Sequence, residues 1–250
     1  MGVTAVIPIS VRRWVLYRLP VLLGNTSAHR VRYMAFQAAD DAHYARFVAG
    51  QRNNHAQNLA IEWLEQDSLL PEKFSLLDIG CGPGAFLSLI RDRAGLAKRI
   101  DYTGVDQAEG AVRYAERTWG ARFLHRDVLA DGLPEGAFDV ISVNEVIEHI
   151  ADYRPLLSAI AQRNPKVLIL GTFAVIPEYE RDRRLWRPDL QCYMNSYALA
   201  PLFRFMHETL GGEIRTVDFG THDHDRYWFP KKTQMLWYRR ARPPEATAAE

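Results

Sequence analysis

Short apolar runs recur through the middle of the chain, and segments with helical periodicity separate them. Five runs of five or six residues are predicted as strands: 75–79, 101–105, 121–125, 138–143 and 166–170. Amphipathic stretches predicted as helices lie at 54–67, 85–93, 108–118 and 153–162. Strands that alternate with helices indicate a parallel sheet built from right-handed crossovers.

The last third of the chain has a different pattern. Residues 172–195 are predicted to be irregular, and Ser196 is predicted to be the N-cap of a helix. That helix carries apolar side chains at helical spacing, namely Leu199, Leu202, Phe203, Met206 and Leu210. Gly211 ends it, and residues 213–219 and 234–239 are predicted as two final strands.

These patterns predict three parts. Residues 1–52 are a basic, aromatic-rich N-terminal helical leader, residues 53–240 are the α/β domain, and residues 241–250 are a disordered tail. For the leader we consider three roles, a lid over a binding cleft, a dimer contact and a weak membrane-surface anchor.

Composition narrows the class of protein. The chain has 250 residues and 48% hydrophobic content, enough for one substantial core. A net charge of +1 does not favour a protein dominated by polyanion binding. Two distant cysteines indicate a reduced, cytoplasmic protein, and no apolar run approaches the roughly 20 residues that cross a bilayer.

A glycine-rich loop follows the first predicted strand. The chain reads Leu-Leu-Asp-Ile-Gly-Cys-Gly-Pro-Gly-Ala-Phe from residue 76, so that Gly80, Gly82 and Gly84 alternate after Asp78. A Cβ there would block both the tight turn and a closely approaching ligand. The loop therefore predicts a nucleotide-like cofactor, and a dinucleotide is one candidate.

Polar side chains also follow the other strands. Asp106 follows the second strand, where a carboxylate can accept both hydroxyls of a ribose, and Asp127 follows the third, where it can receive an adenine amino group. Asn144 and Glu145 follow the fourth strand, and Asp78 is placed to bind a cationic amino group. Ligands of open α/β sheets bind at this carboxyl edge.

Taken together, the series resembles the class I S-adenosylmethionine-dependent methyltransferases over about residues 54–240. The glycine loop, the two carboxylates and the block Phe-Asp-Val-Ile-Ser-Val-Asn-Glu-Val-Ile-Glu-His-Ile from residue 138 occur in the family's order. The resemblance implies a Rossmann-like, doubly wound, seven-stranded sheet, mostly parallel with an antiparallel last strand, plus N-terminal helices. A dinucleotide-dependent oxidoreductase is the minor alternative.

The resemblance implies a set of cofactor-binding residues for S-adenosylmethionine. The three glycines would face its methionine moiety, and Asn144 would contact it from the fourth strand. The implied set is Asp78, Gly80, Gly82, Gly84, Asp106, Gln107, Asp127, Val128 and Asn144. Tyr44, Arg46 and Arg52 are candidates for a further contact from the preceding helices.

Candidate catalytic residues lie in the block after Asn144. If a helical turn begins there, Glu145, Glu148 and His149 share one face and could hold a divalent metal such as Mg²⁺. The alternative is structural, because a helix dipole favours glutamates at its N-terminus and His149 can cap or pack. The block resembles ubiquinone-pathway O-methyltransferases and small-RNA 3′-end 2′-O-methyltransferases.

A second histidine group lies between the last two predicted strands. If the sixth strand is parallel to the first five, His222 or His224 opens at the same edge as Glu145 and could complete a metal site or act as a base. The alternative is a solvated polar turn. The RNA-type enzymes place a further histidine after the fifth strand, but residues 172–196 contain none, which weakens the RNA assignment.

The segment after the fifth strand is predicted to shape the acceptor pocket. Its aromatic and basic residues could stack on a planar acceptor or meet its carboxylate or phosphate: Tyr179, Trp186, Tyr193, Arg181, Arg183, Arg184 and Arg187. The sequence thus predicts a methyltransferase acting on a small-molecule hydroxyl. An RNA methyltransferase and a non-catalytic binding module are the alternatives.

Overall fold

The apolar runs form the strands of one central sheet in a computed structural model, which describes residues 39–176, 179–187, 192–222 and 232–240. The strands of the main path are β1 (Phe74–Ile79), β2 (Ile100–Asp106), β3 (Arg122–His125), β4 (Val140–Asn144), β5 (Val167–Ile176), β9 (Glu213–His222) and β10 (Lys232–Arg240). Their bounds agree with the predicted runs within a few residues, except that β5 continues to Ile176.

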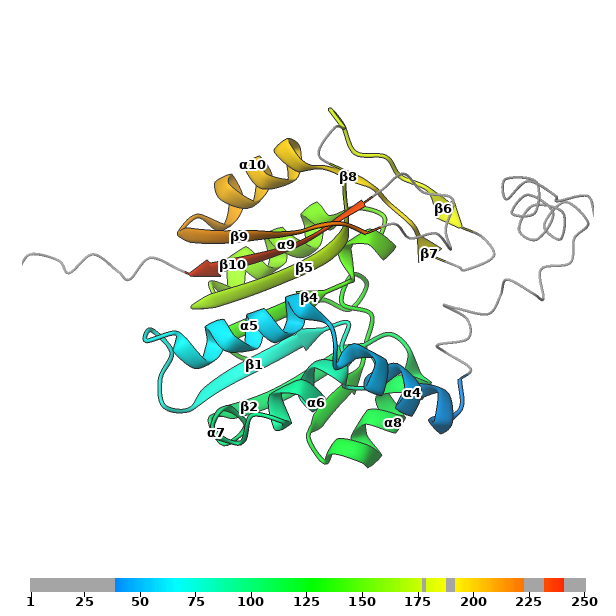
Figure 1. The fold of residues 1–250 in the computed structure, drawn as a ribbon, viewed down its shortest axis with the longest axis vertical. Helices are drawn as coiled ribbons and strands as arrows, with labels where there is room; N and C mark the ends of the chain where they lie inside the picture. The colour runs from blue at the N-terminus through cyan, green and yellow to red at the C-terminus, as the bar shows by residue number, and fades with distance from the viewer. Residues whose placement is uncertain (1–38, 177–178, 188–191, 223–231, 241–250) are drawn as a thin grey trace, which may run out of the picture.

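The sheet has the order β3-β2-β1-β4-β5-β10-β9 (Figure 1). Strands β1 to β5 pair in parallel, whereas β10 is antiparallel to both β5 and β9. The predicted Rossmann-like sheet with an antiparallel last strand is therefore confirmed. Because β9 runs in the same direction as β5, the chain leaves β9 at the carboxyl edge of the sheet.

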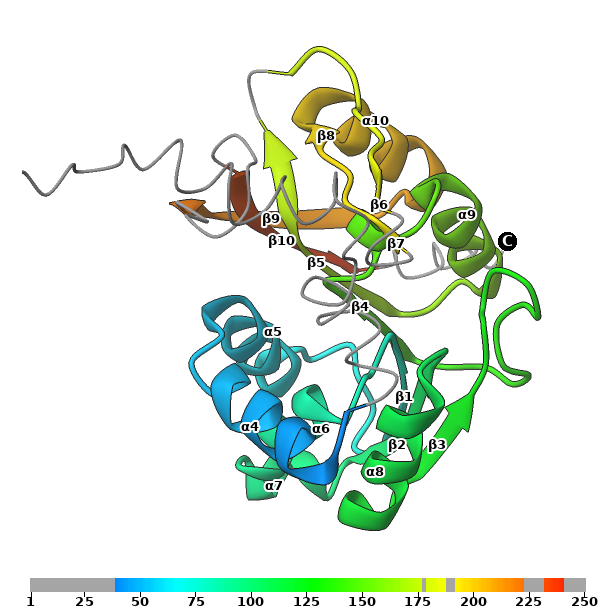
Figure 2. The same cartoon turned by 90° about the vertical axis from the view of Figure 1, so that its right-hand side faces the viewer.

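Helices cover the two faces of this sheet (Figures 1 and 2). They are α4 (Asp41–Gln51), α5 (His55–Gln66), α6 (Ala85–Arg91), α7 (Ala94–Ala97), α8 (Glu109–Trp119), α9 (Tyr153–Arg163) and α10 (Leu199–Leu210). Side chains alternate across the strands, so Leu76 faces the core under α5, α6 and α8 while Leu77 faces the core under α9 and α10. The sheet is thus buried on both sides, as parallel sheets require.

The segment after β5 is more regular than predicted. It contains β6 (Trp186–Arg187) paired with β7 (Cys192–Tyr193), and β8 (Tyr197–Ala198), which pairs with β5. The prediction that Ser196 caps the last helix is wrong, because Ser196 is held in an extended bridge to Arg183. The N-cap residue is Ala198, which has no side chain that could cap the helix. The N–H of Ala198 donates to Asp182 Oδ1 at 3.1 Å.

Only part of the predicted leader lies within the described residues. Its last segment is α4, which contacts α6 and α8. Residues 1–38 and the predicted tail 241–250 lie outside the described residues, so the lid and tail stay predictions. None of the described helices combines the length and apolar character that crossing a bilayer would take.

Replacing Arg239 by methionine is expected to lower the free energy of unfolding by about 2–4 kcal/mol. The buried guanidinium donates to the carbonyl oxygens of Leu210, the last residue of α10, and of Gly211 and Pro165, which follow α10 and α9. Its loss leaves these carbonyls without a donor. Urea denaturation measures the change, and the exposed Arg215, replaced in the same way, should change stability by less than about 0.5 kcal/mol.

Candidate cofactor and acceptor site

The glycine loop is fixed by hydrogen bonds within the protein. The N–H groups of Gly80 and Cys81 both donate to the carbonyl of Val105, at 2.8 and 3.1 Å. Gly82 N donates to Asp106 Oδ2 at 2.8 Å, and Gly84 N donates to the Cys81 carbonyl at 3.0 Å. Gly80, Gly82 and Gly84 all have positive φ. The loop thus holds a turn that only glycine adopts at low cost.

Asp106 joins the glycine loop to the start of α8. Besides Gly82 N, its carboxylate accepts the N–H of Ala108 at 2.7 Å. Burial raises the pKa of this carboxyl, whereas these N–H donors lower it. Asp106 therefore lies between the loop and a helix start, at the end of β2 where the ribose contact is predicted.

Asp78 is buried at the end of β1, where the Tyr102 hydroxyl donates to its Oδ2 at 2.7 Å. Burial is the largest influence and raises the pKa of Asp78 to about 7, although hydrogen bonds from Tyr102 and Ser142 lower it. A buried carboxyl with this pKa is stabilised in its charged form by a cation. That property fits the predicted partner, a cationic amino group.

Replacing Asp78 by asparagine is expected to stabilise the protein at pH 8 by about 2 kcal/mol. The raised pKa means that the folded state binds a proton between about pH 4 and 7 that the unfolded state does not. Wild-type stability should therefore fall as pH rises through this window, and the variant should lack this contribution. Denaturation at pH 4 and pH 8 measures it; a less stable variant at pH 8 would contradict the argument.

The predicted adenine end lies along β3. Asp127 is exposed, and its Oδ1 accepts the N–H of Leu129 at 2.9 Å, which shapes the turn after the strand. Val128 packs against the core beneath α9, while the His125 ring bonds the Gln107 carbonyl at 3.1 Å. Because β3 pairs with β2, these residues lie at the same sheet edge as Asp106.

Asn144 ends β4 and carries a buried acceptor. Its Nδ2 donates to Ser142 Oγ at 2.7 Å, whereas its Oδ1 has no hydrogen-bond partner within the described part of the chain. A Cβ on Gly171 would lie 2.5 Å from that Oδ1, so a side chain at position 171 would displace the Asn144 amide. A buried acceptor without a donor is costly, and a ligand amino or hydroxyl group would satisfy it.

Glu145 adopts an unusual backbone conformation at the carboxyl edge. Its φ is 56°, a left-handed value that is rare outside glycine. Its N–H donates to the Gly171 carbonyl at 2.8 Å, and its Oε1 accepts Asn54 Nδ2 at 3.1 Å. Burial and then the neighbouring Glu148 raise the pKa of Glu145 to about 7, while Asn54 and His149 lower it.

The predicted helical turn after Asn144 is therefore wrong. The left-handed Glu145 interrupts it, and a short 3₁₀ helix, η2 (Ile147–His149), follows instead. The Glu148 side chain is fully buried, and its Oε1 accepts Phe173 N at 3.4 Å. The three side chains do not share one helical face. Across the described ranges no group of three or more His, Cys, Asp or Glu side chains could hold a metal, so the Mg²⁺ prediction is not supported.

His149 is held by the segment after β5. Its Nδ1 lies 3.1 Å from the Tyr193 carbonyl oxygen, and its ring lies 6.0 Å from that of Phe173. If Nδ1 carries the proton and donates to that carbonyl, Nε2 is the basic nitrogen. Of the second histidine group, the His222 backbone pairs with Lys232 at the end of β9, and His224 lies outside the described residues.

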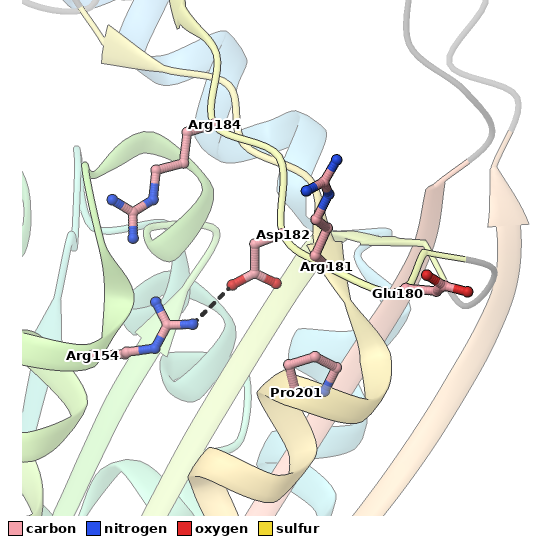
Figure 3. A pocket seen from close by; sticks show the side chains of 6 residues that line it. All are labelled: Arg154, Glu180, Arg181, Asp182, Arg184 and Pro201. Atoms are coloured by element: carbon pink, nitrogen blue, oxygen red, sulfur yellow. Dashed lines mark hydrogen bonds and ion pairs between the residues drawn. The ribbon is translucent and has the colours of Figure 1, made fainter.

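An open cavity of about 480 Å³ lies where the segment after β5 meets α9 and α10 (Figure 3). Its lining residues are Arg154, Glu180, Arg181, Asp182, Arg184 and Pro201. Arg154 pairs with Asp182 at 3.1 Å, and Arg184 pairs with Asp152 at 2.8 Å. Since their charges are matched by carboxylates, these two arginines anchor the segment to α9.

The aromatic side chains of this segment also contact one another. Trp186 and Tyr193 form an edge-to-face pair with ring centroids 5.0 Å apart, and Trp186 is 46% exposed. The Arg183 guanidinium lies 4.2 Å from the centre of the Tyr179 ring. The side chain of Arg187 lies outside the described ones. The exposed Trp186 is thus available to a planar ligand.

Among the three candidates on the preceding helices, Tyr44 is the one on which the charge of Asp106 acts. It is buried against Ala108 and Ala111 of α8, and burial followed by the charge of Asp106 raises its pKa. Arg46 is exposed, and Arg52 forms an exposed ion pair with Asp92 at 3.5 Å.

Three residues of the site were missed from the sequence. Tyr102 and Asn54 hold the carboxylates of Asp78 and Glu145, and Trp119 donates from Nε1 to the Pro83 carbonyl at 2.8 Å. Asn54 directly precedes a segment of apolar helical periodicity, a position typical of an N-cap residue. In the structure Asn54 is the N-cap of α5. Nothing in the sequence signals its partner 91 residues away.

Comparisons with known proteins agree with this arrangement. Residues 45–204 match the family described as a methyltransferase domain. An uncharacterised methyltransferase of Mycobacterium tuberculosis is 36% identical over 105 residues, 40% of this chain and 49% of that protein. The chain thus spans about half the length of the curated relatives it matches first.

Two further proteins are similar over longer stretches. The ubiquinone biosynthesis O-methyltransferase of Pseudomonas aeruginosa is 24% identical over 191 residues, 73% of this chain and 69% of that protein. Magnesium protoporphyrin IX methyltransferase from Synechocystis PCC 6803, solved with bound SAH, superposes with a TM-score of 0.53 at 20% identity, covering 77% of this chain and 84% of that one. This structural similarity shows the shared fold.

Proposed function

The chain belongs to the methyltransferase-domain family, and from this premise we propose that it moves a methyl group from S-adenosylmethionine to a hydroxyl oxygen of a small molecule. The observation that carries the proposal is the placement of Asp78, Asp106 and Asn144 around the glycine loop. Asp78 is the penultimate residue of β1, and Asp106 and Asn144 end β2 and β4. These three strands are parallel neighbours within the part of the chain that matches the family.

The residues present fit this cofactor. The buried Asp78 carboxyl suits a cationic amino group, and Asn144 Oδ1 is a buried acceptor without a donor in the described residues. The Asp106 carboxylate, between the loop and α8 at the end of β2, would accept the two ribose hydroxyls. When bound, S-adenosylmethionine supplies an electrophilic methyl group on a sulfonium. Gly80, Gly82 and Gly84 would hold its methionine moiety.

Transfer to an oxygen needs alignment and removal of one proton. Alignment of nucleophile and methyl group alone supplies much of the rate. We assign the proton to Glu145, whose pKa of about 7 suits a group that is ionised yet basic near neutral pH. His149 is the second candidate for this role, and the buried Glu148 supports the backbone at Phe173 rather than touching an acceptor.

The acceptor class rests on the segment after β5 and on one relative. Trp186 and Tyr193 offer an aromatic surface, and the similar protein of Pseudomonas aeruginosa is named an O-methyltransferase of ubiquinone biosynthesis. Pairing of Arg154 and Arg184 with carboxylates leaves fewer cations for a phosphate backbone. Both points favour a planar small molecule over RNA.

The test has two stages. Calorimetry with S-adenosylhomocysteine should show binding in the micromolar range, since metabolite-level cofactors are typically bound there. Incubation with methyl-labelled S-adenosylmethionine and a metabolite extract should then yield a labelled small molecule, identified by mass spectrometry. Label in RNA instead would move the assignment to a nucleic-acid acceptor, and no binding of S-adenosylhomocysteine would overturn the proposal.

A further inference from the structure

The indole of Trp119 fills the space beside the last glycine of the loop. Gly84 has a φ of +86°, and a Cβ on it would lie 2.5 Å from Trp119 Nε1 and 2.6 Å from Trp119 Cδ1. The conflict is therefore with a side chain of the protein itself. Gly84 is required for the packing of Trp119 as well as for its backbone conformation.

The same indole makes a directed contact to the loop. Its Nε1–H donates to the carbonyl of Pro83 at 2.8 Å. Pro83 has no N–H of its own, and it is buried. The Pro83 carbonyl is therefore hydrogen-bonded within the protein, and so are the N–H groups of Gly80, Cys81, Gly82 and Gly84.

Trp119 is itself held from two sides. It is the last residue of α8, and Gly120 caps that helix in a left-handed conformation directly after it. Arg91, at the end of α6, donates from Nη2 to the Trp119 carbonyl, and its guanidinium lies 5.5 Å from the centre of the indole ring. The helix that follows the glycine loop is thereby tied to the residue that supports the loop.

We propose that Trp119 is a positioning residue that holds the glycine loop in its cofactor-binding shape before the ligand arrives. This inference rests on the proposed use of S-adenosylmethionine. A loop that is already ordered loses little conformational freedom when a ligand binds, so its affinity is higher. Without the indole N–H, the Pro83 carbonyl loses its donor and the loop gains alternatives of similar energy.

The test compares Trp119→Phe with Trp63→Phe. Trp63 packs edge-to-face on Tyr238, with ring centroids 5.2 Å apart, and touches no residue of the loop through an observed hydrogen bond or ring contact within the described chain. Calorimetry should show S-adenosylhomocysteine affinity reduced about tenfold in Trp119→Phe and changed less than about twofold in Trp63→Phe. Thermal melts of both variants separate this loss from a loss of stability.

A second variant isolates the hydrogen bond if Trp119→Phe folds poorly. Incorporation of 3-benzothienylalanine at position 119 keeps the ring shape and removes only the N–H donor, and it should reproduce a loss of several-fold in affinity. Wild-type affinity in both variants, with lowered melting temperatures, would reduce Trp119 to a structural role and overturn the inference. Absence of binding in the wild-type protein would instead overturn the proposed function on which it rests.

Discussion

Replacing Asp106 by alanine is expected to weaken S-adenosylhomocysteine binding by about a hundredfold or more. Two losses combine in this variant. The carboxylate that would accept the ribose hydroxyls disappears, and the N–H groups of Gly82 and Ala108 lose their acceptor, so the loop and the start of α8 come apart. Calorimetry with the purified protein measures the affinity.

Two further variants separate these losses. Asp106→Asn keeps one oxygen acceptor for a backbone N–H, and we expect it to bind about tenfold less tightly than wild type. Asp101 lies on the same strand but is exposed, so Asp101→Ala should bind as wild type does. An Asp106→Ala variant that melts like wild type and binds with near-normal affinity would overturn the assignment of Asp106 to the ribose.

The sheet could be predicted because burial on both faces leaves a strong record in the sequence. Leu76 and Leu77 are both fully buried although they face opposite sides, which produces the continuous apolar runs of a parallel sheet. The residues that end these runs could be placed for the same reason, because parallel strands bring their carboxyl ends to one edge. This topology brings Asp78, Asp106 and Asn144 to one edge, while their roles toward a cofactor rest on the family resemblance and stay predictions.

The block after β4 could not be predicted, since its conformation depends on distant contacts. Helical spacing of Glu145, Glu148 and His149 suggested a shared face, but Glu145 takes a left-handed φ. Two partners hold Glu145 in this conformation. Asn54 lies 91 residues before it in the chain, and the Gly171 carbonyl belongs to β5, the next strand of the sheet. A pattern of spacing contains no information about such partners.

The role of the glycines was predicted only in part. The glycine spacing predicts that a Cβ would obstruct both the turn and a ligand, and the positive φ values of the loop confirm that its turn needs glycine. At two positions, however, the obstruction lies within the protein, since a Cβ on Gly80 would collide with Val146 Cγ2 and one on Gly84 would meet Trp119. Packing against remote side chains thus adds a constraint that the motif alone does not reveal.

Replacing Glu145 by glutamine is expected to lower kcat for methyl transfer about a hundredfold while changing S-adenosylhomocysteine affinity less than about threefold. The amide keeps the size of the side chain and its bond to Asn54 but cannot accept a proton. Turnover with the identified acceptor and calorimetry with S-adenosylhomocysteine give the two quantities. The exposed Glu116 of α8, replaced by glutamine, is the matched control.

The pH profile gives an independent readout of the same group. A base works in its ionised form, so kcat of the wild-type enzyme should rise as pH increases through about 7 and level off above it. Glu148 and His149 are the charged groups that act on Glu145, and Asn54 is its hydrogen-bond donor.

A change at Asn54 should shift this profile. Asn54→Ser retains an N-cap for α5 but shortens the donor to Glu145. Because Asn54 lowers the pKa of Glu145, the midpoint of the kcat profile should move to higher pH in this variant. If Glu145→Gln keeps full turnover and His149→Gln loses it, the proton goes to His149 and the assignment of Glu145 is wrong.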